Sequence, residues 1–188
     1  MNIKTILFFI LLFFNILNYV KKCRHINYID YNIFLGDYTA ANDINLFLNN
    51  NITDILVVGL ELSKVFPKNF TYKQIHIDDY YQENIFKYFY DSINFIENSK
   101  KNVYIHCYMG ISRSSTIVIA YIMYKKKISF KEAFNFVKEK RNCVFPNVGF
   151  ADQLILFEKY LKNNNYNINN LNNIKLEDLK KQYNKEFI

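Results

Sequence analysis

The sequence predicts an α/β domain with a central, mostly parallel β-sheet flanked by helices on both faces. Two observations support this prediction. Short apolar runs typical of buried strands alternate along the chain with longer segments whose apolar residues recur at helical spacing. The chain has 188 residues and a hydrophobic fraction of 51%, which suits one packed core and is short for two. Strands that alternate with helices favour a parallel sheet, because each helix carries the chain back to the edge where the next strand begins.

The first half of the chain carries a hairpin pattern, two helix patterns and two strand patterns. Alternating residues predict the hairpin, and Gly36 ends it. The first helix has Ile44, Phe47 and Leu48 at helical spacing. The predicted elements are, in order, a hairpin over 28–37, a helix over 41–51, a buried strand over 55–58, a strand over 70–77 and a helix over 85–98.

The second half carries a short strand followed by three helices. The first of these helices is apolar on all sides, which is typical of a central, buried helix. The second opens with Ser129 and Glu132, the spacing of a capping box. The predicted elements are a strand over 102–106 and helices over 114–125, 129–141 and 149–161. The Asn-rich tail over 162–188 is interpreted as a linker from 163 to 173, followed by a short solvent-facing helix over 175–187.

Residues 1–22 form a hydrophobic, signal-like segment. Its apolar run over 6–20 would span about 22 Å as a helix, less than the roughly 30 Å hydrocarbon core of a bilayer. Because no small-residue cleavage pattern follows the run, we expect an uncleaved anchor or membrane-docking segment. More positive residues follow the run than precede it, which favours the cytoplasmic face of a membrane for the main domain. Cys23, just beyond, could be acylated, but a bystander thiol is the favoured interpretation.

Charge and ligand-forming residues argue against several other classes of protein. The net charge is +7, yet the lysines are scattered and there is no dense arginine run, so we predict no nucleic-acid partner. The cysteines lie too far apart for a disulfide framework, which indicates a reducing compartment. The histidines lack metal-ligand spacing, so neither a metal nor another cofactor is expected. These residues are Cys23, Cys107 and Cys143, and His25, His76 and His106. The sequence leaves the oligomeric state open.

The segment HCYMGISRSS, residues 106–115, joins the strand over 102–106 to the helix that starts near Ser114. In α/β folds, ligands bind beyond the carboxyl ends of the strands, where the following helix offers unpaired N–H groups and the positive end of its dipole. Composition also marks this loop, because only three of the 24 basic residues are arginines and one of them is Arg113, while Gly110 is one of four glycines. We therefore expect the loop to bind an anion.

Each residue type in this loop suits chemistry on a phosphate. A helix N-terminus and a nearby fixed cation favour the thiolate form of Cys107, which is the nucleophilic form. Arg113 can bind two phosphate oxygens at once through its planar fork. Gly110 lets the backbone turn its N–H groups inward. Ser114 can donate a hydrogen bond to the thiolate, and His106 can fix the cysteine backbone through its ring.

These residues give the chain a family resemblance. HCYMGISRS, residues 106–114, resembles the His-Cys-x5-Arg-Ser/Thr signature of cysteine-dependent protein tyrosine phosphatases, and GISRSST resembles the dual-specificity phosphatase branch. The similarity extends to IFLGDYTAA, AYIM and PNVGFADQLILFE and covers roughly residues 26–161, so it implies a catalytic domain with a phosphotyrosine-phosphatase-like fold. Met109 departs from the pattern, because most relatives have a small residue there.

The resemblance implies a two-step, metal-independent mechanism. Cys107 would attack phosphorus and form a phosphocysteine, with Arg113 and Ser114 assisting the reaction. A carboxylic acid on an upstream loop would protonate the departing oxygen and then activate water. The family spacing assigns this role to Asp79, with Asp78 as the alternative. The phosphate-binding residues would be Tyr108, Met109, Gly110, Ile111, Ser112 and Arg113, with His106 as structural support.

The side chains between Cys107 and Arg113 are uncharged, which suits a single phosphate on a protein better than a polyphosphorylated lipid or an RNA end. We therefore expect phosphorylated proteins as partners, with MAP kinases as one option. Phosphotyrosine, phosphoserine and phosphothreonine are the expected targets. Tyr80, Tyr81 and Tyr108 could stack on a phosphotyrosine ring.

Two other classes of protein stay open at this point. A non-catalytic phosphate-binding module would share the fold but typically lacks the nucleophile, whereas Cys107 is present. A rhodanese-like sulfurtransferase also uses a cysteine loop with a nearby arginine, but without the Arg-Ser entry into a long apolar helix. Cys143 is interpreted as a core residue rather than a redox partner of Cys107. Asn147 and Gln153 match the family pattern and are interpreted as packing and loop support.

Overall fold

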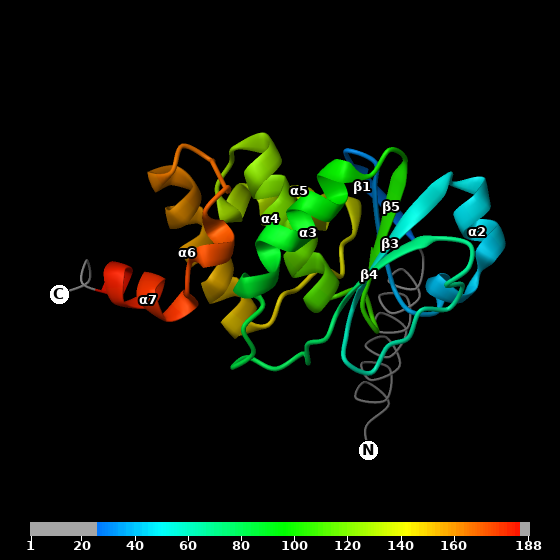
Figure 1. The fold of residues 1–188 in the computed structure, drawn as a ribbon, viewed down its shortest axis with the longest axis horizontal. Helices are drawn as coiled ribbons and strands as arrows, with labels where there is room; N and C mark the ends of the chain where they lie inside the picture. The colour runs from blue at the N-terminus through cyan, green and yellow to red at the C-terminus, as the bar shows by residue number, and fades with distance from the viewer. Residues whose placement is uncertain (1–25, 185–188) are drawn as a thin grey trace, which may run out of the picture.

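The computed structural model describes residues 26–184, which form a five-stranded sheet with helices on both faces (Figure 1). The strand order is β1-β2-β5-β3-β4. β1 is antiparallel to β2, and every other neighbouring pair is parallel, so the predicted mostly parallel sheet is confirmed. The strands are β1 (Asn27–Asp30), β2 (Ile33–Gly36), β3 (Ile52–Val58), β4 (Thr71–Ile75) and β5 (Asn102–His106).

The helices follow the predicted order, with boundaries set by their caps. The first α-helix begins only at Ile44, because the Asp43 carboxylate caps it by accepting the N–H of Leu46 at 3.1 Å. The predicted capping box of Ser129 and Glu132 is present. The α-helices are α2 (Ile44–Asn49), α3 (Phe89–Asn98), α4 (Arg113–Lys126), α5 (Phe130–Lys140), α6 (Val148–Asn163) and α7 (Leu176–Asn184), and the 3-10 helices are η1 (Ala40–Asn42), η2 (Phe86–Tyr88) and η3 (Leu171–Asn173).

The sheet separates two apolar clusters. Successive side chains of a strand point to opposite faces, so Ile55 and Val57 of β3 join the cluster beneath η1 and α2, while Leu56 and Val58 join the larger cluster beneath α3 to α6. Figure 1 shows α2 on one side of the sheet and the longer helices on the other. The helix α4 lies at the centre of the larger cluster, with every residue from 113 to 123 buried, as its apolar sequence predicts.

The C-terminal tail differs from its prediction. The segment interpreted as a linker, together with the helix expected to face solvent, packs onto the domain. Asparagine dominates the composition of the tail, but its few apolar side chains are spaced so that they reach the core together. They are Ile168, Leu171, Leu176, Leu179 and Tyr183, all buried. The tail therefore completes the domain, and α7 lies beside α6 at the end of the molecule away from the sheet (Figure 1).

The predicted anchor, residues 1–22 with its apolar run over 6–20, lies outside the described residues, as does Cys23. Within residues 26–184, no helix combines the length and the apolar composition that crossing a membrane requires.

The strand register brings four loops to one edge of the sheet. Gly36 at the end of β2 and Val57 near the end of β3 both lie opposite His106 at the end of β5. Val58 lies opposite Ile75 at the end of β4. The loops that leave these parallel strands therefore open side by side, at the edge where α/β proteins bind ligands.

Candidate active site

The loop over residues 107–112 connects β5 to α4 and holds a buried thiol. Cys107 is 2% exposed. Its Sγ accepts the backbone N–H of Gly110 at 3.2 Å and the hydroxyl of Ser114 at 3.2 Å. Gly110 belongs to the loop that leads into α4, and Ser114 lies in the first turn of α4, where the helix dipole is positive. The loop therefore surrounds the sulfur with groups that stabilise negative charge on it.

Gly110 gives the loop its curvature. Its φ is +65°, and a Cβ atom at this position would stand 2.3 Å from the carbonyl oxygen of Gly36. Only glycine combines this backbone conformation with so close an approach.

Arg141 holds the same loop from its outer side. This side chain is 1% exposed. Its Nε donates to the carbonyl oxygen of Gly110 at 2.9 Å, and its Nη2 donates to that of Met109 at 3.1 Å. A third bond joins its Nη1 to Asn27 in β1 at 2.8 Å. Carbonyls held outward leave the loop's N–H groups free to point inward. Arg141 is another of the three arginines in the sequence, and no local motif indicates its partners.

Arg113 is oriented by Glu61, a residue that sequence reasoning missed. Nη1 and Nη2 of Arg113 each lie 2.7 Å from one carboxylate oxygen of Glu61, in a two-pronged pair. Burial of the Arg113 guanidinium opposes its charge, but the hydrogen bond to Glu61 and the nearby acidic groups outweigh burial and raise the pKa of Arg113. The same bond to Arg113 lowers the pKa of Glu61. Arg113 Nε is buried and has no hydrogen-bond partner among the described residues.

Asp79 contacts the loop over residues 107–112, whereas Asp78 does not. Asp79 Oδ1 accepts the hydroxyl of Ser112 at 2.7 Å and the side-chain amide of Asn147 at 2.8 Å. Its other oxygen lies 3.9 Å from Arg113 Nε. Asp78 is exposed. The structure thus brings Asp79 together with the predicted phosphate-binding residues, and Asn147 holds it there.

Two residues near the start of α6 anchor the loop that carries Asp79. Gln153 is 4% exposed, and it accepts the N–H of Phe86 at 2.9 Å and donates to the carbonyl of Glu83 at 2.8 Å. This agrees with the predicted supporting role of Gln153. Gly149 lies against Tyr81, since a Cβ at position 149 would stand 1.8 Å from the Tyr81 carbonyl oxygen. No sequence pattern indicates this close approach.

His106 lies directly behind the loop. Its ring stacks on Tyr104 with centroids 5.3 Å apart, and its Nδ1 lies 3.4 Å from the carbonyl oxygen of Cys107. Burial lowers the pKa of His106 to about 4, although its contact with the Cys107 carbonyl opposes this shift. The ring is therefore neutral near pH 7, and it suits the predicted supporting position rather than proton transfer.

The rim of the site carries exposed side chains, which are Tyr80, Tyr81, Tyr108 and Met109. The rings of Tyr80 and Tyr81 lie 4.6 Å apart. Met109 is 41% exposed, so the side chain that departs from the family pattern lies at the surface. Cys143 is fully buried, as expected of a core residue. Residues 26–184 contain no group of three or more His, Cys, Asp or Glu arranged to hold a metal ion.

Comparison with known proteins gives consistent results. Residues 33–160 match the family model described as "Dual specificity phosphatase, catalytic domain". The chain is 35% identical over 144 residues to Dual specificity protein phosphatase 1B of Arabidopsis thaliana, across 75% of this chain and 86% of that protein. It is 40% identical over 131 residues to MAP kinase phosphatase with leucine-rich repeats protein 1 of Dictyostelium discoideum, across 69% of this chain and 16% of that protein.

Among solved structures, the chain is similar to the human tyrosine phosphatase-like serine/threonine/tyrosine-interacting protein. The TM-score is 0.71 and the identity 32%, with 74% of this chain and 99% of that chain covered. It is also similar to a leucine-rich repeat and phosphatase domain containing protein from Entamoeba histolytica, with a TM-score of 0.68, 29% identity, and coverage of 76% of this chain and 96% of that chain.

A buried thiol in the loop before a helix N-terminus, with an arginine as the first residue of that helix, is the arrangement of a cysteine-dependent hydrolase of phosphate esters. The chain belongs to the dual-specificity phosphatase family. It is a protein phosphatase with the phosphatase-like fold expected from its sequence, and phosphorylated proteins are its class of substrate. The comparisons favour neither the non-catalytic module nor the sulfurtransferase.

Proposed function

We propose that Cys107 is the nucleophile of a phosphatase reaction that passes through a phosphocysteine. The observation that carries this proposal is the pair of 3.2 Å hydrogen bonds to Cys107 Sγ, from Gly110 and Ser114. In the first step, Cys107 Sγ attacks phosphorus and the ester P–O bond breaks. Loop N–H groups and Arg113 Nε, which has no hydrogen-bond partner among the described residues, bind the phosphoryl oxygens.

Asp79 supplies and then removes the proton in this mechanism. It protonates the departing oxygen in the first step. In the second step it takes a proton from water, which attacks phosphorus and breaks the P–S bond. Ser114 stabilises the thiolate that leaves. The position of Asp79 supports this role, because its carboxylate is hydrogen-bonded to Ser112 and lies beside Arg113. Both aspartates are exposed, but no such contact is seen for Asp78 among the described residues.

The substrates in this proposal are phosphotyrosine and phosphoserine or phosphothreonine of proteins, including MAP kinases. The uncharged side chains of the loop support a single phosphate as the ligand. Tyr80, Tyr81 and Tyr108 are exposed at the rim, where they can contact a substrate ring. The name of the Dictyostelium relative, a MAP kinase phosphatase, supports the choice of MAP kinases as the first proteins to test.

Hydrolysis of aryl phosphates in the presence of a chelator tests the residue roles. We expect turnover by the full chain and none by Cys107→Ser. Asp79→Ala is expected to lower kcat about 100-fold or more, because general acid–base catalysis contributes that much. Asp78→Ala is the matched control and should stay within about threefold of the parent. Turnover that survives Cys107→Ser, or equal losses in the two aspartate variants, would contradict the proposed roles.

We also propose that residues 6–20 attach the chain to the cytoplasmic face of a membrane. The support is the apolar run, flanked by Lys4 on one side and by Lys21, Lys22 and Arg24 on the other. Fractionation of the full chain and of a chain without residues 1–22 tests this, with the shorter chain expected to leave the membrane fraction. The same distribution for both chains would refute attachment through this segment.

A further inference from the structure

A groove beside the active site is built jointly by the phosphatase domain and the C-terminal tail. Its volume is about 350 Å³. The walls come from the loop after Asp79, from the first turns of α6 and from α7. The lining includes Tyr81, Val148, Asp152, Leu176, Glu177 and Lys180. The matched family domain ends at residue 160, so α7 is a wall that this domain alone does not supply.

The groove is lined by close sequence neighbours of the residues that contact Asp79. The side-chain amide of Asn147 donates to the Asp79 carboxylate at 2.8 Å. Val148, the next residue after Asn147, lines the groove, and so does Tyr81, two residues after Asp79. A polypeptide that presents a phosphorylated side chain to Cys107 therefore has this groove within reach of its neighbouring residues.

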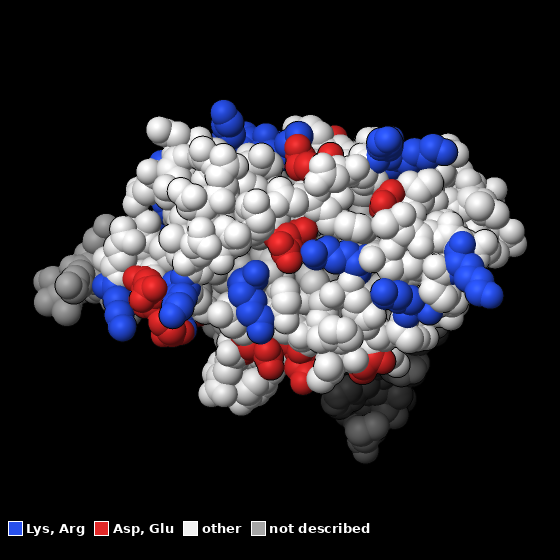
Figure 2. Space-filling view, in the orientation of Figure 1, with Lys and Arg blue, Asp and Glu red and all other residues white. Residues whose placement is uncertain are grey.

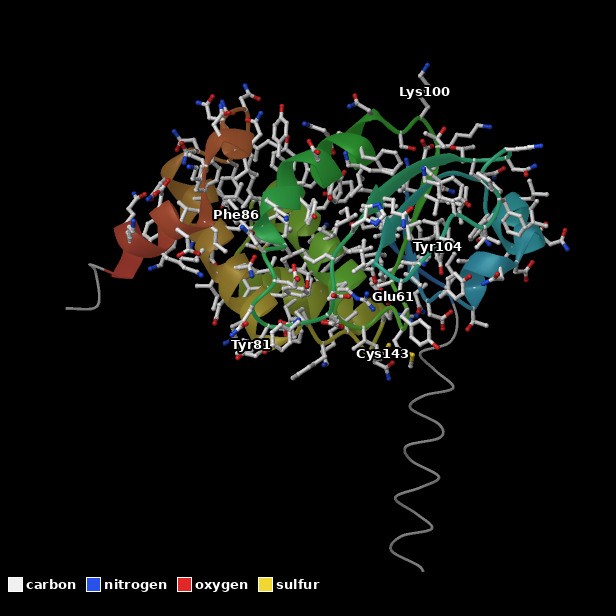
Figure 3. The ribbon with its side chains drawn as sticks, turned by 60° about the horizontal axis from the view of Figure 1, so that its bottom comes forward. Glu61, Tyr81, Phe86, Lys100, Tyr104 and Cys143 are labelled. Atoms are coloured by element: carbon white, nitrogen blue, oxygen red, sulfur yellow. The ribbon has the colours of Figure 1, made fainter. Side chains whose placement is uncertain are left out.

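The groove combines an apolar interior with acidic side chains. Val148 is 67% exposed and Tyr81 50%, while Leu176 forms a buried part of the lining. Figure 3 shows Tyr81 on the side of the first turns of α6, away from Glu61. Large apolar side chains left exposed beside a catalytic site commonly mark an interaction surface.

Charge indicates what the groove accepts. The chain carries a net charge of +7, and Figure 2 shows lysines spread over the visible face, with acidic side chains among them at the α7 end. Asp152 and Glu177 are exposed on the groove. Within residues 26–184, the ion pair of Glu177 is with Lys180, at 3.0 Å, and both partners are largely exposed. An exposed pair of this kind contributes little to stability and is easily exchanged for another cation.

We propose that this groove binds the polypeptide segment next to the phosphorylated residue of a protein substrate, with a lysine or arginine of that segment opposite Asp152 and Glu177. The proposal rests on the phosphatase activity and adds a preference to it. A small aryl phosphate occupies only the Cys107 loop, whereas a phosphopeptide extends into the groove.

The tail offers a matched pair of variants. Glu177 and Asp178 are neighbouring, exposed acidic residues in the first turn of α7, and only Glu177 lines the groove. The experiment compares Glu177→Lys with Asp178→Lys in the full chain. For each protein, kcat/KM for a phosphopeptide is divided by kcat/KM for p-nitrophenyl phosphate, so a general loss of activity cancels.

Three phosphopeptides serve as probes, with two lysines before the phosphorylated residue, two after it, or none. We expect Glu177→Lys to lower the ratio about fivefold or more for one of the lysine peptides, in line with close charge pairs at interfaces. The loss should shrink at high salt, because screening weakens exposed charge pairs. Asp178→Lys should leave the ratio unchanged, and the peptide without lysines should not distinguish the variants.

Several outcomes would contradict the proposal that the groove binds substrate, while leaving the phosphatase assignment intact. Equal ratios for the parent and Glu177→Lys on all three peptides would do so, as would equal losses in both variants. A dimer of the parent that dissociates in Glu177→Lys, measured by sedimentation, would show that a second copy of the chain occupies the groove instead. Failure of the proposed function would be recognised separately, as loss of p-nitrophenyl phosphate turnover in the parent.

Discussion

At the scale of single residues, the orientation of Arg113 depends on Glu61. Glu61 takes both terminal nitrogens of Arg113 and fixes the plane of the guanidinium. Arg113 Nε is left buried without a hydrogen-bond partner. Unsatisfied buried donors are costly and rare, and the phosphate proposed to bind this loop would supply an acceptor for this N–H. Arg113 is already oriented before substrate binds, so it does not have to reorganise during the reaction, which favours binding and catalysis.

His106 leads to a prediction about pH. Burial lowers the pKa of His106 to about 4, whereas an unfolded chain has the ordinary histidine value of about 6.5. Between these values the unfolded state binds more protons than the folded state, so stability falls as pH decreases through this window. The contribution is fully present above pH 6.5. Lowering the pH from 7 to 4.5 should therefore remove about 2 kcal/mol of unfolding free energy through this residue.

Urea unfolding at the two pH values measures this contribution in the parent and in His106→Asn, which lacks the titrating ring. The parent should lose about 2 kcal/mol more than the variant between pH 7 and pH 4.5. His76→Asn is the control, because His76 is exposed, and it should behave like the parent. Equal pH dependence in the parent and in His106→Asn would show that the ring is not kept neutral by burial.

At the scale of elements, the loop over residues 107–112 depends on a close contact with the end of β2. Gly110 approaches the carbonyl of Gly36, and Arg141 from the end of α5 binds the outer carbonyls of the loop. The loop conformation is thus determined by β2, β5 and α5 together. A loop fixed from several elements holds its N–H groups in place without reorganising during the reaction.

Gly110→Ala should therefore damage catalysis more than a one-carbon change suggests. The added Cβ meets a backbone oxygen at 2.3 Å, at a φ of +65°, and an L-residue in this region costs about 1–2 kcal/mol before the clash is counted. We expect kcat/KM for an aryl phosphate to fall about 100-fold or more, since small misplacement of a catalytic group has effects of this size. Far-UV circular dichroism should stay native. A folded variant with kcat/KM within threefold of the parent would contradict this account.

The sequence predicted the elements and the central loop well, for a physical reason. Hydrophobic periodicity and caps act locally, and the segment from His106 to Ser114 carries its chemistry in consecutive residues. Glu61 and Arg141 were missed because their contacts are not local. Glu61 lies 52 residues from Arg113, and Arg141 lies 31 residues from Gly110. Only the register of the parallel strands and the packing of the helices bring these pairs together.

At the scale of the whole molecule, the tail belongs to the folded domain. Its interpretation as a linker followed by a solvent-facing helix missed this packing, because composition obscured periodicity. Leu176, Leu179 and Tyr183 recur three and four residues apart, which puts them on one face of α7. All three are buried, and α7 packs against α6. Packing of α7 therefore contributes to the stability of the fold, and α7 also forms part of the surface beside the active site.

Leu179→Ala tests whether the tail is part of the cooperative unit. Leu179 is 4% exposed, and truncating a buried leucine costs about 2–5 kcal/mol, with the lower end expected for a helix at the edge of the core. For a chain of this size, a loss of about 2 kcal/mol lowers Tm by roughly 4–8 °C. Lys181→Ala on the exposed side of the same helix is the control, and it should change stability by less than about 0.5 kcal/mol. Thermal unfolding followed by circular dichroism measures both. If α7 faced solvent instead, the two variants would unfold at the same temperature, so a Tm gap between them distinguishes a docked tail from a linker.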